Sequence, residues 1–132
     1  MSFLLDTHVF LWWIMGDARF PKALADELSM GGKAVYLSVA SLWEMAIKHK
    51  LGKLELSVKG PFDDFILRQV QLNRIELLPL HAPHVLGTLH LPPHHRDPFD
   101  RVLIAQAKAE NLQLVSRDPQ LKLYPINLYW PQ

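Results

Sequence analysis

Residues 97–116 read DPFDRVLIAQAKAENLQLVS, a helix followed closely by a strand. Asp97 is suited to cap the helix, and Pro98 fits its first position because proline needs no hydrogen-bond partner for its nitrogen there. Strong helix formers continue to Ala107, and the apolar run Leu112–Ser116 has the length of a buried strand. The stretch therefore predicts a helix that packs on a sheet and leads into its next strand.

The same alternation of strand and helix extends in both directions from this stretch. We expect strands at Ser2–Leu5, Ala34–Leu37, Ile75–Leu80, Leu112–Ser116 and Ile126–Trp130. We expect helices at residues 7–15, 21–31, 39–51, 61–73, 82–89 and 98–107. Strands joined by crossover helices form a mostly parallel sheet with helices on both faces. The prediction is an α/β, three-layer α/β/α fold with four to five strands, in which the direction of the last strand stays open.

Length and composition indicate one globular domain spanning residues 1–132. Hydrophobic residues make up 49% of the chain, which argues against disorder. The absence of cysteine excludes disulfides, zinc–thiolate sites and thiol nucleophiles. The longest apolar run, Val9–Met15, is too short to span a bilayer, and Asp6 interrupts any secretory signal. We therefore expect a soluble cytoplasmic protein without a membrane partner.

The formal net charge is only +1, so any contact with nucleic acid must come from local basic patches. One patch lies at the end of the third predicted helix and contains Lys48, His49, Lys50 and Lys53; the other lies on both sides of Asp97 and contains His94, His95, Arg96 and Arg101. The candidate phosphate contacts in these patches are Lys48, Lys50, Arg96 and Arg101.

Four acidic residues lie where apolar strands give way to helices or loops. They are Asp6, Glu44, Asp100 and Asp118. Because functional groups gather at the carboxyl ends of parallel strands, these separated stretches can bring their carboxylates together. Clustered carboxylates repel one another, and a hard divalent cation neutralises them. The four acids therefore predict a Mg²⁺ or Mn²⁺ site suited to phosphate chemistry.

Each acid also has a structural explanation. Asp6 could cap the helix after the first strand, Asp97 and Asp100 suit a helix start, and Asp118 precedes a proline in a turn. Mutual repulsion predicts that Asp6→Asn stabilises the metal-free fold, whereas loss of a cap predicts the opposite.

Glu44 has the strongest structural alternative. The stretch from Ser41 to Glu44 matches the capping box Ser-x-x-Glu, in which the Glu serves the helix terminus. Ser38 could instead begin the helix one turn earlier, which would place Glu44 in its second turn, free for a site.

Histidines suggest a second kind of metal site. The chain has seven, and five of them lie between residues 81 and 95. His81 and His84 stand three residues apart on an expected helix, a spacing that can bind zinc, but no Glu completes a hydrolase motif. A zinc site here is the weaker hypothesis.

Four segments, taken in order, resemble the PIN-domain ribonucleases, in particular the toxin of VapBC-type toxin–antitoxin pairs. They are residues 4–12 (LLDTHVFLW), 38–48 (SVASLWEMAIK), 95–107 (HRDPFDRVLIAQA) and 114–118 (LVSRD). The resemblance covers essentially the whole chain and implies a PIN-like fold with metal-binding acids at Asp6, Glu44, Asp100 and Asp118. It also implies a helper hydroxyl at Ser116, while Asp97 belongs to a subgroup and has no settled role.

The resemblance further implies a homodimer and a cognate antitoxin whose C-terminal segment covers the active site. The expected reaction is hydrolysis of RNA phosphodiesters with one or two Mg²⁺ or Mn²⁺ ions held by the acids. Two alternatives remain, a structure-specific DNA nuclease and a non-catalytic module that binds RNA or protein and uses its acids as caps. Binding of a divalent metal separates the last alternative from the enzymes.

Overall fold

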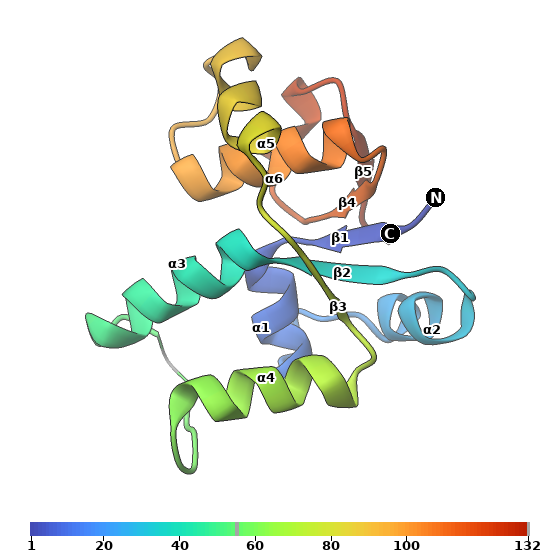
Figure 1. Ribbon diagram of the computed structural model, residues 1–132. Helices are drawn as coiled ribbons and strands as arrows, with labels where there is room; N and C mark the ends of the chain where they lie inside the picture. The colour runs from blue at the N-terminus through green and yellow to red at the C-terminus, as the bar shows by residue number, and fades with distance from the viewer. Residues whose placement is uncertain (55, 132) are drawn as a thin grey trace.

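The computed structural model describes residues 1–54 and 56–131 and shows an α/β fold around one parallel sheet (Figure 1). The strands are β1 (Phe3–Leu5), β2 (Val35–Ser38), β3 (Glu76–Leu78), β4 (Gln113–Val115) and β5 (Asn127–Tyr129). Their order in the sheet is β3-β2-β1-β4-β5, and all neighbours run parallel. The predicted fold class is confirmed, and the direction of the last strand is now known to be parallel.

The helices follow the predicted alternation, with shifts at their ends. They are α1 (Thr7–Met15), α2 (Lys22–Met30), α3 (Val39–Lys50), α4 (Phe62–Leu72), α5 (Ala82–Gly87) and α6 (Pro98–Ala109), with 3₁₀ turns η1 (Thr88–His90) and η2 (Pro119–Leu123). The expected helix 82–89 ends early, since the Thr88 hydroxyl donates to the Val85 carbonyl where η1 begins. Among the described residues, no helix is long and apolar enough to cross a membrane.

Both faces of the sheet are buried, as the three-layer prediction requires. Phe3 and Leu5 of β1 belong to a core cluster with side chains of α1, α2 and α4. Leu4, which points to the opposite face, belongs to a second cluster with α6 and η2. In Figure 1, α5 and α6 cover one side of the sheet, and α1, α2 and α4 cover the other.

The strand order places a topological switch point between β1 and β4. The chain moves outward from β1 through β2 to β3, then returns across the sheet to β4 and β5 on the other side of β1. Parallel α/β sheets bind ligands outside the carboxyl ends of the strands at such a point. Leu5 pairs with Val115, so the next residues, Asp6 and Ser116, leave the sheet side by side.

Candidate active site

Asp6 combines a structural task with a place at the switch point. Its Oδ1 accepts from the His8 backbone N–H at 3.3 Å and caps α1, while its Oδ2 accepts from the Ser116 hydroxyl at 2.7 Å. Burial alone would raise the pKa of the Asp6 carboxyl, but the hydrogen bonds from His8 and Ser116 outweigh it and lower the pKa. Asp6 is thus held ionised by its own partners, and Asp6→Asn remains a test of whether loss of the cap or relief of the repulsion on Asp100 has the larger effect.

Glu44 is buried on α3, and the capping-box interpretation of it is wrong. Ser38 caps the helix, since its hydroxyl accepts from the Ala40 N–H at 3.0 Å, whereas Ser41 accepts from the Thr7 hydroxyl at 2.8 Å. Glu44 therefore lies in the second turn, with 2% of its surface exposed. Its Oε2 pairs with Lys48 Nζ at 2.7 Å. Its Oε1 is buried and has no hydrogen-bond partner in the described chain.

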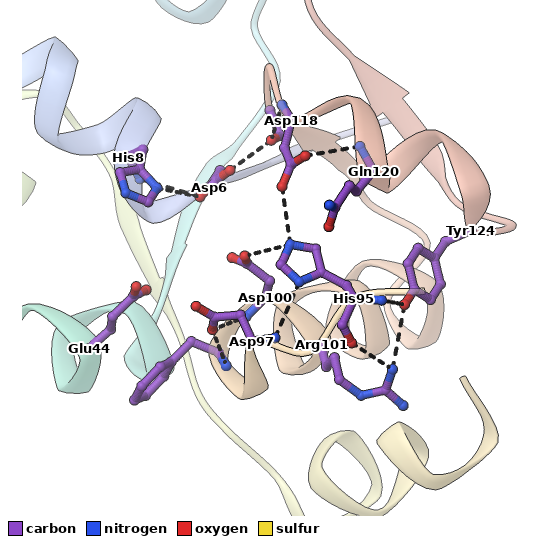
Figure 2. Close-up of polar contacts among 12 residues, drawn as sticks. Asp6, His8, Glu44, His95, Asp97, Asp100, Arg101, Asp118, Gln120 and Tyr124 are labelled. Carbon is purple, nitrogen blue, oxygen red and sulfur yellow. Dashed lines mark hydrogen bonds and ion pairs between the residues drawn. The ribbon is translucent and has the colours of Figure 1, made fainter. Parts of the chain in front are cut away.

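Asp97 and Asp100 divide the start of α6 between them. Asp97 Oδ1 accepts from the backbone N–H groups of Phe99 and Asp100, at 2.9 and 3.2 Å, and is the helix cap that the sequence predicted. Asp100 lies in the first turn and directs its carboxylate into the space that Asp6 and Glu44 also face (Figure 2). Asp97 thus caps the start of α6, and the first turn of α6 directs Asp100 into the site.

The Asp100 carboxyl is the acid whose ionisation the fold opposes most. Burial, followed by the negative charges of Asp6 and Asp97, raises its pKa to about 7 even though His95 lies beside it. Glu44 adds repulsion of the same sign. An added divalent cation would reverse this effect, because it favours the ionised form.

This shift predicts how the free energy of unfolding depends on pH when EDTA is present. The folded protein binds the Asp100 proton more tightly than the unfolded chain, so stability falls as pH rises from about 4 to about 7. The Asp6 shift acts below this window, since its pKa is lowered. Urea unfolding across the window should show the decline, and Asp100→Asn should flatten it. An equal slope in that variant would contradict the assignment.

Ser116 and Asp118 connect the end of β4 to the site. The Ser116 hydroxyl donates to Asp6 and accepts from the Asp118 backbone N–H at 3.1 Å, so it fixes the first residue of the site against the last. Asp118 Oδ1 caps η2 through the Gln120 N–H at 2.9 Å. Its other oxygen, Oδ2, lies 3.1 Å from His95 Nε2.

His95 is the site residue that the sequence did not single out. Its Nε2 also lies 3.0 Å from Asp100 Oδ2, so the imidazole joins two of the predicted acids (Figure 2). Ligand atoms of His95, Asp100 and Asp118 all lie within 4.8 Å of one another, the one such group of three found in residues 1–54 and 56–131. A histidine two residues before the helix cap was the available signal, but sequence alone placed it in a basic patch.

The predicted phosphate contacts differ in their surroundings. Lys48 lies at the site, where burial lowers its pKa but the carboxylates of Glu44, Asp97 and Asp100 together raise it by more. Lys50 and Arg96 are exposed.

Arg101 was predicted as a phosphate contact, but its guanidinium is already used by the fold. Its terminal nitrogens donate to four backbone carbonyls and one hydroxyl. The carbonyls belong to Thr88, Leu91, Pro92 and His95, and the hydroxyl to Tyr124. The guanidinium therefore secures the segment that carries His95, and it has little capacity left for a ligand.

The alternative zinc pair has a structural role. His84 is buried, its Nδ1 accepts from the His81 backbone N–H at 3.0 Å, and its Nε2 lies 3.1 Å from Glu110 Oε1. The pair does not belong to a three-residue metal cluster anywhere in the described ranges. These histidines fix α5 against the end of α6.

Comparison with known proteins shows the family of this chain. The family model for the PIN domain matches residues 3–127, nearly the whole chain. The chain belongs to the PIN domain family. The resemblance to PIN domains and the predicted α/β fold are thereby confirmed.

Solved structures share the PIN fold at low sequence identity. They include VapBC2 from Rickettsia felis bound to a promoter DNA fragment, with a TM-score of 0.70, 18% identity and 98% of each chain covered. FitAcB from Neisseria gonorrhoeae has a TM-score of 0.65 and 19% sequence identity, again with 98% of each chain covered. A toxin–antitoxin complex from Klebsiella pneumoniae has a TM-score of 0.65 and 15% sequence identity, with 99% of this chain and 98% of that chain covered. A search of curated proteins finds no match.

The carboxylates of this PIN domain fit a divalent cation. The unpartnered Glu44 Oε1 is a buried oxygen that lacks a donor in the described chain, and the Asp100 carboxyl resists ionisation without added positive charge. Oxygen donors of this kind suit Mg²⁺ and Mn²⁺.

Proposed function

We propose that this PIN domain is a metal-dependent endoribonuclease that hydrolyses RNA phosphodiesters. One observation carries the proposal: Glu44 and Asp100 are buried or half-buried acids whose charges are only partly compensated by their partners Lys48 and His95 in the described chain. Neither caps a helix there, Glu44 keeps an oxygen without a partner, and Asp100 is forced to a pKa of about 7. Buried acids that are only partly compensated lower the stability of the fold, and folds keep them at functional sites.

The proposed active site contains Asp6, Glu44, Asp100 and Asp118, with Mg²⁺ or Mn²⁺ as cofactor. A divalent cation there supplies Lewis acidity and neutralises charge that develops on the phosphate. Asp6 and Asp100 are the first candidates to hold it, and Glu44 completes the set with its unpaired Oε1. Ser116 keeps the Asp6 carboxylate in one orientation through its 2.7 Å hydrogen bond.

Lys48 supports the same chemistry from α3. It lies against Glu44 and is kept charged there, which gives the site a cation that can approach the substrate phosphate. Arg96 and Lys50 are exposed and remain candidate contacts to the RNA backbone. RNA enters best as a splayed single strand or loop, since base edges are accessible there.

The alternative of a non-catalytic binding module has its own support. Asp6, Asp97 and Asp118 each cap a helix or a 3₁₀ turn, as that hypothesis requires. It gives no account of Glu44 and Asp100, however, and these two acids favour the enzyme.

The deciding experiment is cleavage of a panel of single-stranded RNAs, stem-loops and duplex DNAs by purified protein, with Mg²⁺, Mn²⁺ or EDTA. We expect RNA cleavage that depends on metal and that falls at least about 10-fold in Glu44→Gln, by analogy with loss of residues around metal sites. Glu27→Gln, a charge-matched change on the exposed surface of α2, is the control. Cleavage of duplex DNA would favour the DNA nuclease. A wild-type protein that neither binds metal nor cleaves RNA would favour the binding module.

We further propose that the protein is the toxin of a type II pair and binds a cognate antitoxin. The solved structures with this fold include toxin–antitoxin complexes. An apolar groove of about 440 Å³ between α3 and α4, lined by Leu42, Met45, Phe62, Ile66 and others, offers a partner an apolar surface. Expression in bacteria should arrest growth, and co-expression of a neighbouring small gene product should restore it. Normal growth at full expression would contradict this role.

We also propose a homodimer. Trp43 on α3 and Leu51, the residue that follows α3, are each 61% exposed, and Val39 and Ile47 belong to the same stripe at four-residue spacing. Apolar stripes of this kind mark surfaces that another chain covers. Light scattering after gel filtration should give twice the 15.2 kDa chain mass. Trp43→Ser should shift the protein towards the monomer, and a monomeric wild type would contradict the proposal.

A further inference from the structure

His95 lies between two acids where a second cation would otherwise be placed. Its Nε2 is 3.0 Å from Asp100 Oδ2 and 3.1 Å from Asp118 Oδ2. Two-metal nuclease sites hold ions about 3.5–4 Å apart, bridged by shared carboxylates. A cation bound between Asp100 Oδ2 and Asp118 Oδ2 would need the place that the His95 nitrogen takes.

The His95 ring is oriented to donate. Its Nδ1 accepts from the Asp97 backbone N–H at 3.2 Å, and because an amide N–H can only donate, the proton of the neutral ring lies on Nε2. A histidine that binds metal has the opposite arrangement, since its remote nitrogen donates to a carboxylate or carbonyl. His95 is therefore built to give Nε2–H to the Asp118 carboxylate, with Asp100 Oδ2 at 3.0 Å from the same nitrogen, rather than a lone pair to a metal.

The segment that carries His95 is fixed from both sides. Its backbone N–H donates to the Tyr124 hydroxyl at 2.8 Å, and its carbonyl accepts from Arg101 at 3.2 Å. Tyr124 also donates to the Pro92 carbonyl at 2.9 Å. The imidazole is only 12% exposed. These contacts hold the ring between the carboxylates, so its position is a feature of the fold and not a choice of one surface rotamer.

We infer that the His95 N–H replaces a second metal ion, so that this chain binds one divalent cation, on the side of Asp100 that faces Asp6 and Glu44. The inference rests on the proposed metal-dependent nuclease. Asp118 then acts on the site through His95, and Asp100 is shared between the imidazole and the cation. His95 is in this sense a positioning residue that limits the site to a single ion.

The test is the number of Mn²⁺ ions bound per chain, measured by calorimetric titration and by the electron paramagnetic resonance signal of free Mn²⁺. We expect one ion for the wild type and two for His95→Ala, the second more weakly bound. His95→Gln, whose amide N–H can reach the same position, should return the number to one. Asp118→Asn should keep one ion, since Asp118 contacts His95. His90→Ala, an exposed histidine on η1, is the matched control and should also keep one.

Each result is decisive. Two ions in the wild type would overturn the inference whatever the variants do, and so would one ion in both wild type and folded His95→Ala. If circular dichroism shows that His95→Ala does not fold, two ions bound by Asp118→Asn or by His95→Gln would still contradict the inference. Zero ions in every protein would count against the proposed nuclease itself, which keeps the two failures apart.

Discussion

Asp100→Asn is expected to reduce metal-dependent RNA cleavage by at least about 100-fold, more than the loss of residues that only surround a metal. The same change should stabilise the protein in EDTA above pH 7. The Asp100 carboxyl has a pKa of about 7 instead of 3.8. At 1.36 kcal/mol per pKa unit, the gain in the free energy of unfolding is at most about 4 kcal/mol. Asparagine keeps the shape and an acceptor for His95, so the change removes charge alone.

Two measurements check this pairing of lost activity with gained stability. Cleavage rates with Mn²⁺ give the first, and urea unfolding at pH 8 in EDTA gives the second. Asp64→Asn is the matched control, because Asp64 also lies in the first turn of a helix but is exposed on α4. An Asp100→Asn protein that cleaves normally would remove Asp100 from the site, and one that is destabilised in EDTA would show that its charge supports the fold.

Arg101→Ala is expected to lower the free energy of unfolding by about 3 kcal/mol, the scale of lost hydrogen bonds to a charged group. The guanidinium links η1, the 91–95 segment and Tyr124, and its removal would leave several carbonyls without their donor. Arg101→Lys should recover only part of the loss, because an ammonium cannot reproduce the planar fork.

Urea unfolding at pH 7 measures the Arg101 effect, with Arg68→Ala, an exposed arginine in the middle of α4, as the control. The expected order of stability is wild type, then Arg101→Lys, then Arg101→Ala. An unchanged midpoint in Arg101→Ala, together with weaker RNA binding, would restore the phosphate-contact prediction that the structure argues against.

The sequence predicted the elements well where the signals are local. Asp97 and Pro98 begin α6 as expected, and the apolar runs at β1 and β4 have the length of buried strands. Caps and strand periodicity depend on residues a few positions apart, so one chain contains the whole signal. The capping box at Ser41 was wrong because Ser38 offered an equally local cap one turn earlier, and sequence could not choose between them.

The candidate site was predictable in part, for a similar reason. Four acids at strand and helix ends identified the edge of the sheet where carboxylates gather. The sequence could not tell which acids cap, since a capping acid and an unpaired one occupy similar positions along the chain. The unpaired Oε1 of Glu44 became visible only when its neighbours in space were known.

By itself, then, the sequence determined the α/β class, the helix at residue 97 and the identity of the four acids. The tertiary structure alone decided that Ser116 reaches Asp6 across 110 residues, that His95 lies between Asp100 and Asp118, and that Arg101 serves the backbone. It alone also gave the direction of the pKa shift at Asp100. Hydrogen bonds and charge interactions depend on distances in space, and those distances arise only when the crossovers bring β1, α3, α6 and the end of β4 to one edge of the sheet.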